Sequence, residues 1–364
     1  MSSFTYFNYG GQGVLHPSVL ETIKANYERI EQLGAYSNAA NAWIEEEKEA
    51  TRSVLAELLQ VKTETITLTQ NTTDGCNIAL WSYPWQPGDH LLLSDCEHPG
   101  IVAIAQTLVK RFGISFSFFP LFNDRDSKDE RVLEVIYSHL TPQTKMIMVS
   151  HICWNTGQIL PLHQIACLCH DRGLWLAVDG AQSVGVLPLN LTELGVDFYA
   201  FTGHKWLNGP LGLGGLYVNP DRLDQALPAF VGWRGLKKKQ LKFEVASIAY
   251  PLLGALRTAI AIESTWGNIT ERYQTIVTKA SDLWTKLNQL SIIKTVCFQP
   301  PRSGLVSFQI ADRSADKVSL LLEEEYQIYL RSIPHPSALR ASVSYKTTEI
   351  DYLIHSLKEI CNRT

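Results

Sequence analysis

The sequence predicts an α/β protein with a mostly parallel seven-stranded sheet in a large domain, followed by a smaller α+β domain. Between Ile66 and Val218, short apolar runs typical of buried strands alternate with helix-like segments. This alternation is the pattern of a wound sheet with helices on its faces. At 364 residues the chain also exceeds the usual size of a single core. A second domain is therefore expected.

Seven apolar runs are the expected strands of the large sheet. They cover residues 66–69, 91–94, 115–119, 145–150, 174–178, 197–201 and 215–218. The last run follows the glycine-rich turn 209–214, which leaves no room for a crossover helix. We therefore expect that strand to run antiparallel to the one before it.

The second domain is expected after two long helices. Apolar residues at helical spacing predict these helices over 251–266 and 269–290. Strands are expected at 305–310 and 342–345, with a helix over 315–326 between them. The predicted division places residues 15–266 in the large domain, and residues 1–14 with 267–364 in the small domain.

Composition narrows the class of protein. The net charge of −4 gives no electrostatic reason to expect nucleic acid, and the basic run Lys237–Lys239 is short. No secretory signal is visible and no apolar stretch of about 18 residues predicts a membrane span. The seven cysteines are an odd, scattered set, which fits a reducing compartment. We expect a cytoplasmic enzyme.

An aspartate and a lysine follow two neighbouring strands. Asp179 ends the run 174–178, and Lys205 comes shortly after the run 197–201 in Gly203-His204-Lys205-Trp206. Parallel strands place ligands at their carboxyl ends, so the two side chains are expected to meet there. A buried carboxylate needs a cation, and a protonated pyridine nitrogen is one. The pair predicts pyridoxal 5'-phosphate, with Lys205 holding its aldehyde as a Schiff base.

Other polar residues come at the same ends of strands. Thr72 and Thr73 open a predicted helix; taken alone they favour a plain N-cap, but beside Lys205 we expect the helix amino terminus to bind phosphate. His98 could stack on a flat ring, and the amide of Asn155 could bind the ring oxygen or a substrate carboxylate. Arg331 and Arg340 flank the segment 332–339, which we expect to be a loop, and either guanidinium could grip a carboxylate.

Two other patterns have a simpler interpretation. His163, Cys167 and His170 share a helical face and could hold zinc, but the segment is apolar and its cysteines more often pack as small hydrophobic residues. We predict no metal site. The glycines at 10–13 and 209–215 lack the strand and helix context of a nucleotide loop, so they serve tight turns or close backbone approach.

Together these residues resemble the fold type I pyridoxal-phosphate enzymes of the class V aminotransferase and cysteine desulfurase-like family. Within it, the pattern is most similar to the cysteine/cystine C-S lyases of cyanobacteria. The resemblance spans nearly the full chain and rests on six motifs: Asn8-Tyr9-Gly10-Gly11-Gln12-Gly13, Asp95-Cys96-Glu97-His98-Pro99-Gly100, Asp179-Gly180-Ala181-Gln182-Ser183, Phe201-Thr202-Gly203-His204-Lys205-Trp206, Val231-Gly232-Trp233-Arg234 and Phe243-Glu244-Val245-Ala246.

The resemblance implies a role for each matching residue. Lys205, Asp179 and His98 match the Schiff-base lysine, the pyridine partner and the ring stacker. Gln182 matches the partner of the ring hydroxyl, and Asn155 a contact to substrate or ring oxygen. Phosphate contacts are matched by Thr72, Thr73, Thr202 and His204. Arg340 matches the substrate-carboxylate arginine and Arg331 a second arginine of the lyases. Ser247 matches a position that reaches the phosphate of a neighbouring subunit, which implies a homodimer.

Two departures bear on the reaction. Cysteine desulfurases carry a nucleophilic cysteine ahead of the carboxylate arginine, whereas residues 298–360 contain none. In addition, the segment Gly235–Lys242 is shorter than its counterpart in the lyases. The leading hypothesis is β-elimination of cystine or cysteine to pyruvate, ammonia and a persulfide or sulfide, with a protein as a sulfur acceptor. The alternatives are a desulfurase-like enzyme or aminotransferase acting on another amino acid, and a noncatalytic cofactor-binding or sulfur-relay protein.

Overall fold

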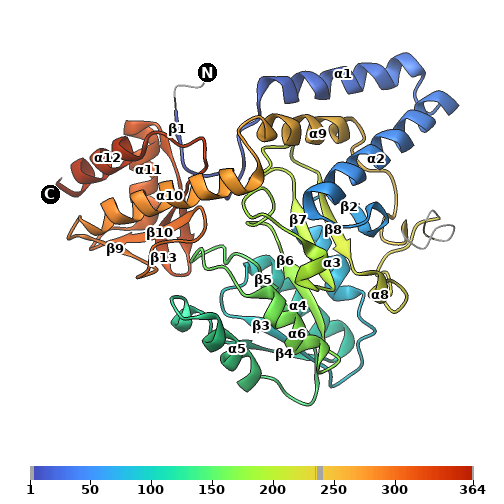
Figure 1. The fold of residues 1–364 in the computed structure, drawn as a ribbon, viewed down its shortest axis with the longest axis horizontal. Coiled ribbons are helices and arrows are strands. Elements are labelled where there is room, and N and C mark those ends of the chain that lie inside the picture. The colour runs from blue at the N-terminus through green and yellow to red at the C-terminus, as the bar shows by residue number, and fades with distance from the viewer. Residues whose placement is uncertain (1–3, 234, 236–240, 363–364) are drawn as a thin grey trace.

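A twisted seven-stranded sheet forms the centre of the molecule (Figure 1). The computed structural model describes residues 4–233, 235 and 241–362, so Arg234 and the basic run 237–239 lie outside the described residues. The strand order is β2-β8-β7-β6-β5-β3-β4. The strands are β2 (Ile66–Thr69), β3 (His90–Ser94), β4 (Ser115–Phe119), β5 (Thr144–Ser150), β6 (Trp175–Asp179), β7 (Phe198–Thr202) and β8 (Gly214–Val218).

The direction of each strand agrees with the sequence prediction. β8 pairs antiparallel with both β2 and β7, whereas the pairings among β3, β4, β5, β6 and β7 are parallel. The predicted α/β class with a mostly parallel seven-stranded sheet is confirmed. The carboxyl ends of β5, β6 and β7 consequently lie side by side at one edge.

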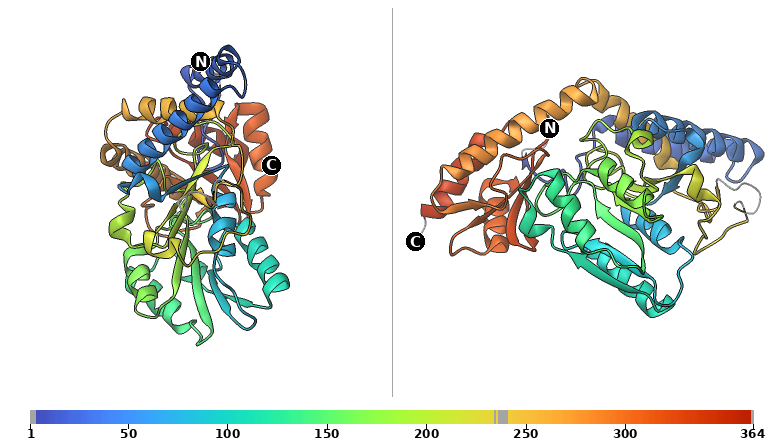
Figure 2. Two further views of the ribbon diagram at one scale, coloured as in Figure 1. Left: turned by 90° about the vertical axis from the view of Figure 1, so that its right-hand side faces the viewer. Right: turned by 60° about the horizontal axis from the view of Figure 1, so that its bottom comes forward.

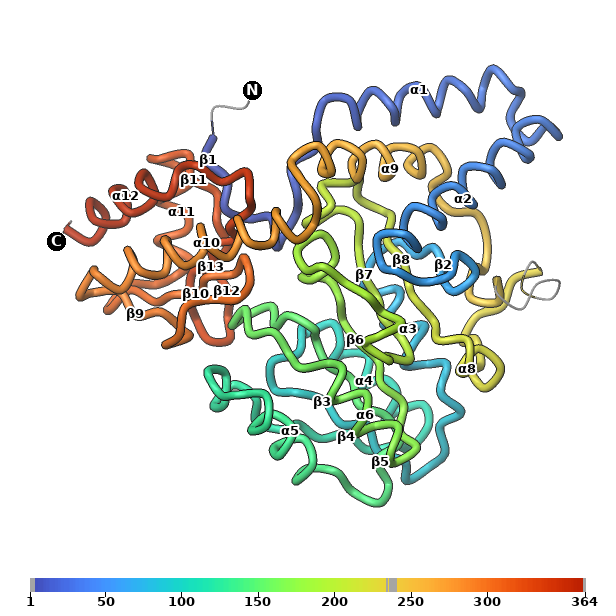
Figure 3. The backbone as a smooth tube through the Cα atoms, in the orientation of Figure 1, coloured from blue at the N-terminus to red at the C-terminus, as the bar shows by residue number. Residues whose placement is uncertain are grey.

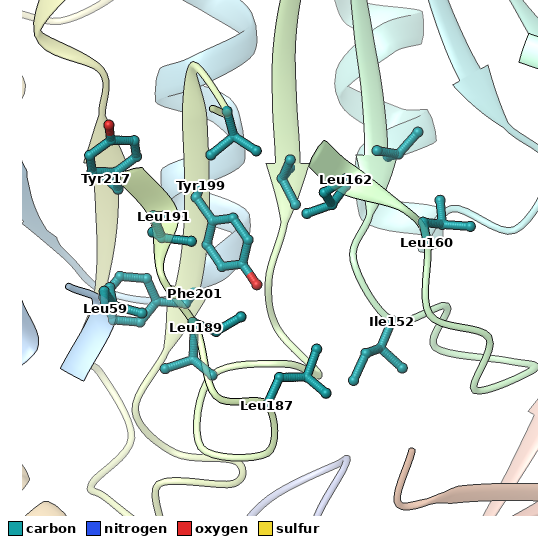
Figure 4. Close-up of a cluster of buried hydrophobic side chains, with 14 of the residues drawn as sticks. Leu59, Ile152, Leu160, Leu162, Leu187, Leu189, Leu191, Tyr199, Phe201 and Tyr217 are labelled. Carbon is teal, nitrogen blue, oxygen red and sulfur yellow. The ribbon is translucent and has the colours of Figure 1, made fainter. Parts of the chain in front are cut away.

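Alternate residues of the buried strands face two separate cores. Leu91 and Leu93 of β3 belong to the core that includes residues of α3 and α4, whereas Leu92 belongs to the core that includes residues of α5 and α6. Figure 4 shows part of the latter core around Tyr199 and Phe201. The helices and turns of the larger-sheet region, from just before β2 to the segment after β8, are α3 (Thr72–Trp81), α4 (Pro99–Phe112), α5 (Asp129–Ser138), α6 (Leu162–His170), α7 (Leu191–Leu194) and α8 (Pro220–Leu223), with short 3-10 turns at Thr63–Thr65 and Phe122–Asp124.

A smaller antiparallel sheet has the order β12-β13-β10-β9. Its strands are β9 (Ile293–Thr295), β10 (Leu305–Ile310), β12 (Arg331–Pro334) and β13 (Ser337–Ser342). Helices α10 (Ile269–Asn288), α11 (Ala315–Tyr326) and α12 (Ile350–Asn362) contribute to its core. Figure 2 shows α10 extending from the side of the larger sheet to the smaller one.

Two predictions about the smaller sheet are wrong. The segment 332–339 is not a loop but the hairpin of β12 and β13, with Ile333 opposite Ala338. Its two prolines, Pro334 and Pro336, lie at the tip of the hairpin, where strand pairing tolerates them. The strand expected at 342–345 lies earlier in the chain, at Ser337–Ser342, because these residues pair with both β10 and β12.

The amino-terminal segment lies between the two sheets. β1 (Thr5–Tyr6) pairs with β11 (Ile328–Tyr329), and further along the Gly13 amide donates to the His204 carbonyl. Helices α1 (Pro17–Leu33), α2 (Asn38–Leu59) and α9 (Pro251–Ser264) then pack together beside the larger sheet (Figure 3). The domain limits at residues 14/15 and 266/267 stay a prediction. Within the described part of the chain, no helix combines the length and apolar character needed to span a bilayer.

Candidate active site

The predicted site residues converge at the carboxyl ends of the parallel strands. Ser150 at the end of β5 is the register partner of Asp179 at the end of β6, and Asp179 is in turn the partner of Ala200 in β7. The chain then turns from β7 into the segment that carries His204 and Lys205. Three neighbouring strand ends therefore supply the floor of one site.

Asp179 is held by the backbone around it. Its side chain is 8% exposed and accepts a hydrogen bond of 2.9 Å at Oδ1 from the Ala181 amide. A Cβ on Gly180 would lie 2.1 Å from the Tyr199 ring, so only glycine fits after the aspartate. Behind this turn, the Tyr199 hydroxyl contacts His151 Nδ1 at 2.8 Å and Ser183 Oγ at 2.5 Å. The carboxylate therefore has a fixed orientation.

Lys205 is a half-buried residue whose amine is shielded from solvent. Burial lowers its pKa to about 8, while Asp179 opposes that shift and Arg340 and Arg331 add to it. The four charged side chains are thus close enough to affect one another. The amino-terminal segment packs directly over the lysine backbone, since a Cβ on Gly13 would lie 2.3 Å from the Lys205 carbonyl oxygen. At neutral pH an appreciable fraction of this amine is unprotonated.

His98 is the N-cap residue of helix α4 and lies near Lys205, Asp179 and the two arginines. Its Nδ1 accepts from the Gly100 amide at 3.1 Å, which assigns the ring proton to Nε2. Its ring centroid lies 5.4 Å from that of Trp154. Burial lowers the pKa of His98, and Lys205 and the two arginines add to that effect against Asp179. The imidazole is neutral and held at one edge, with a ring face available for stacking on a planar group.

The helix α3 terminus supplies groups that fit a phosphate. Thr72 and Thr73 are its first residues, and the Thr72 hydroxyl is buried with no hydrogen-bond partner among the described residues. The free amides and dipole of a helix amino terminus favour anions. Thr202 Oγ1 lies 2.6 Å from His204 Nδ1, and burial lowers the pKa of His204 to about 4. Asn71 is the N-cap and accepts at Oδ1 from the Asp74 amide, so the helix begins at Thr72 as predicted.

Gln182 is anchored at both ends of its amide. Its Nε2 donates to the Gly10 carbonyl at 2.9 Å, and its Oε1 accepts from Trp206 Nε1 at 2.8 Å. The glycine-containing amino-terminal segment therefore forms part of the site wall, as expected for close backbone approach. One N–H of the amide remains for a ring hydroxyl.

Arg340 and Arg331 lie side by side on the smaller sheet. They are direct register partners on β13 and β12, so their side chains leave the same face with Cβ atoms about 5 Å apart. Arg340 is 1% exposed, and its Nη1 donates to the Trp154 carbonyl at 2.8 Å. Its Nε and Nη2 have no partner among the described residues, and burial with the nearby Arg331 lowers its pKa to about 9. This guanidinium lacks an anion.

Asn155 connects the two sheets. Its Nδ2 donates to the His335 carbonyl at 3.0 Å, and its own carbonyl accepts from Ser307 Oγ at 2.6 Å. The side-chain oxygen Oδ1 is buried and lacks a partner within the described residues. Asn155 thus lies at the site, but its amide nitrogen is bonded to the smaller sheet.

The remaining predicted residues lie apart from these. Ser247 is exposed and borders two cavities of about 500 and 670 Å³, together with residues such as Gln70 and Trp233. Cys167 Sγ is 3.9 Å from His163 Nε2, whereas His170 faces Asp197 at 3.8 Å. Among the described residues, no group of three or more His, Cys, Asp or Glu side chains could hold a metal ion.

Sequence reasoning gave no role to Glu97 or Trp154, which both border the site. Glu97 is buried between Ser94 and Ser150, and Trp154 contacts the His98 ring. The motif around His98 contained Glu97, but nothing in a single sequence indicated that this carboxyl points inward.

Comparison with known proteins identifies the family. The aminotransferase class-V family model matches residues 5–353. The chain belongs to the class V aminotransferase family. The resemblance inferred from the motifs is thereby confirmed.

Three similar proteins indicate which kinds of enzyme within the family this chain resembles. A solved structure of the cystine C-S lyase C-DES in complex with its reaction product cysteine persulfide is 42% identical, with a TM-score of 0.93 over 98% of this chain and 97% of that one. A cysteine desulfurase of Haloferax volcanii is 26% identical over 82% of this chain and 72% of its own length. One of Escherichia coli is 28% identical over 82% of this chain and 78% of its own length. This chain is an enzyme of the cysteine desulfurase and C-S lyase group.

The residues present fit pyridoxal 5'-phosphate. The unpartnered Thr72 hydroxyl and the α3 terminus suit its phosphate, and Asp179 suits its pyridine nitrogen. Lys205 has the depressed pKa that an amine needs to bond an aldehyde at neutral pH. A C-DES variant with a lysine replaced has also been solved with glycine covalently linked to its cofactor of this kind.

We predict that Lys205 captures the cofactor aldehyde with a pH dependence unlike that of a surface lysine. Because the neutral amine is the nucleophile, the capture rate of cofactor-free protein should rise with pH and level off above about pH 8. The capture rate of a solvated lysine continues to rise up to roughly pH 10.4. Borohydride trapping and peptide mapping at each pH measure the rate. A labelled peptide lacking Lys205 would refute the assignment.

We predict that Asp179→Asn lowers kcat by on the order of 10³-fold while the cofactor stays bound. The variant keeps the shape of the turn but removes the charge that stabilises a protonated ring nitrogen. Steady-state kinetics and cofactor absorbance on one preparation separate the two effects. Near-normal kcat would exclude this role.

Proposed function

We propose that this enzyme is a carbon-sulfur lyase that eliminates sulfur from the β carbon of cystine and, less well, of cysteine. With cystine and water, the products are pyruvate, ammonia and cysteine persulfide. The cofactor is pyridoxal 5'-phosphate, which when bound supplies an electron sink for the charge left when the α proton departs. Lys205, Asp179 and His98 are the proposed catalytic residues.

Lys205 has two proposed tasks. It anchors the cofactor, and once substrate replaces it there, its amine takes the α proton. Its pKa of about 8 suits a general base near neutral pH, because the base must be unprotonated yet still hold the proton it takes. Asp179 keeps the ring nitrogen protonated, and the neutral His98 ring covers one face.

The two arginines fit a substrate with two carboxylates. The unpartnered Nε and Nη2 of buried Arg340 suit a bidentate carboxylate at the reacting half. Arg331, beside it on β12 and more exposed, suits the distal carboxylate of cystine. Cysteine lacks that second carboxylate. The amide oxygen of Asn155 is available for the substrate amine or the ring.

The observation that carries the lyase proposal is the state of the cysteines near the smaller sheet. Residues 298–360 contain none. Cys297 Sγ donates to the Thr156 carbonyl at 3.4 Å, and burial raises its pKa to about 12. Burial also raises the pKa of Cys361. A desulfurase needs a thiolate to attack the substrate sulfur, whereas these groups are thiols. In cystine the leaving group is a stabilised persulfide anion, which needs no enzyme thiol.

We further propose a homodimer in which Ser247 contacts the phosphate of the partner subunit. Ser247 is exposed, and large exposed apolar side chains lie on the same chain segment, including Phe230 at 77% and Trp233 at 62%. An exposed group of this kind favours a protein interface. All seven cysteines are free, which supports a reducing compartment such as the cytoplasm, where a sulfur acceptor protein could take the persulfide.

Product analysis tests the lyase proposal. We expect cystine to be turned over with higher kcat/KM than cysteine, with equal amounts of pyruvate and ammonia and no persulfide on the protein. The assay measures pyruvate, alanine and protein-bound sulfane sulfur for each substrate. Alanine as the main product, with persulfide mapped to one of the seven cysteines, would show a desulfurase instead.

We predict that Arg340→Lys lowers kcat/KM for both substrates by roughly 10- to 100-fold, because the charge remains but the bidentate grip is lost. Arg331→Lys should lower it for cystine more than for cysteine. The matched control is Arg313→Lys, an arginine beyond β10. Equal effects of Arg331→Lys on both substrates would show that it does not bind the distal carboxylate.

A further inference from the structure

Glu97 is a buried carboxyl group to which no catalytic or binding role has been assigned above. Its side chain is 6% exposed and lies immediately before the ring stacker His98. Three donors converge on it: the Ser94 hydroxyl on Oε1, the Ser150 amide on Oε1 at 3.0 Å, and the Ser150 hydroxyl on Oε2 at 2.7 Å. Both carboxyl oxygens are thus engaged.

These three hydrogen bonds join two strand ends. Ser94 is the last residue of β3 and Ser150 the last residue of β5, and the two strands are parallel neighbours. Ser150 is also the register partner of Asp179 on the next strand. A single side chain therefore connects the turn before His98 to the strand beside Asp179.

Loss of this connection would shift the two residues that we expect to contact the cofactor ring, His98 and Asp179. His98 is held by the turn 94–98, by the α4 cap and by contact with the Trp154 ring, and Asp179 by β6 and the turn after it. A planar ring that stacks on His98 and meets Asp179 at its edge requires that the distance between these two side chains, here called the offset, stays constant. Sub-ångström changes in such offsets alter rates strongly.

We propose that Glu97 is a positioning residue that sets the offset between His98 and Asp179 by fastening the end of β3 to the end of β5 through Ser150. This rests on the proposed cofactor site, whose ring is the group positioned. Burial raises the pKa of Glu97 to about 7, the serine donors oppose that shift, and the nearby Asp179 adds to it. Glu97 is therefore held by hydrogen bonds alone, from the two serines, and none of its three donors is a cation. The buried carboxyl close enough to affect its pKa is Asp179.

The experiment compares four purified holoenzymes with the native one: Glu97→Gln, Ser150→Ala, the double variant, and the control Asp197→Asn. Asp197 is a matched buried carboxylate, 1% exposed, that accepts from the Leu176 amide and Arg222 at the opposite end of the same sheet. The readouts are melting temperature, the absorption spectrum of the bound cofactor without amino acid, and kcat against KM. The spectrum does not depend on which amino acid the enzyme consumes.

Under the proposal, Glu97→Gln shifts the cofactor band and lowers kcat on the order of 10²-fold, with KM within about a factor of three because Arg340 sets it. Ser150→Ala shows the same signature more weakly, and the double variant loses no more than Glu97→Gln alone. Asp197→Asn lowers only the melting temperature. If Glu97→Gln fails to fold, Ser94→Ala and Ser150→Ala carry the test, since both leave the carboxyl in place.

The proposal is overturned if Glu97→Gln matches Asp197→Asn, with a lower melting temperature but a native cofactor spectrum and native kcat. Additive losses in the double variant would also overturn it, because Glu97 would then not act through Ser150. A failure of the lyase proposal is distinguishable from either result, since it appears in the products of the native enzyme and leaves the spectra unaffected.

Discussion

Burial of charge at one edge of the larger sheet governs this site. Asp179 and Arg340 are buried and Lys205 is half-buried with its amine shielded from water, and each charge would be costly to bury alone. Two arginines and a lysine outnumber the aspartate, so the site is short of negative charge in the absence of ligand. In the function that we propose, an anionic cofactor and a substrate carboxylate supply that charge. Desolvation lowers the pKa values of Lys205 and Arg340, and the neighbouring positive charges add to that effect.

Holding these charges together requires segments far apart in sequence. The amino-terminal glycines pack against Gln182 and the backbone of Lys205, which brings residues 8–13 to the end of β7. The smaller sheet contributes Arg340, which is fastened to the Trp154 carbonyl, while Asn155 bonds to His335. If substrate binds at Arg340 as we propose, it contacts a residue that is bonded directly to the loop 154–155. The site exists only when both sheets are in place.

Sequence reasoning succeeded where burial dictates the pattern. β2, β4, β10 and α11 have the predicted limits because each is a short apolar or strongly periodic segment. No element was predicted before residue 66, so there was no prediction for α1 and α2, and of the α1 residues only Val19 is buried. The segment 332–339, predicted as a loop, is part of the hairpin of β12 and β13, whose prolines lie at its tip. Strand-end position predicted where Asp179, Lys205 and His98 lie. The anchoring of Asn155 and the inward direction of Glu97 depend on tertiary contacts and left no signal in the sequence.

The central claim is that elimination proceeds from this group of buried charges without a nucleophilic thiol of the enzyme. Cys76, Cys96, Cys153 and Cys169 are fully buried, which leaves Cys167, Cys297 and Cys361 with some exposure. The most direct measurement is kcat for pyruvate release from cystine by a variant with these three changed to serine. The account predicts a value within about a factor of two of the native enzyme. A loss of more than tenfold, traced to one of the three by restoring it alone, would contradict the claim.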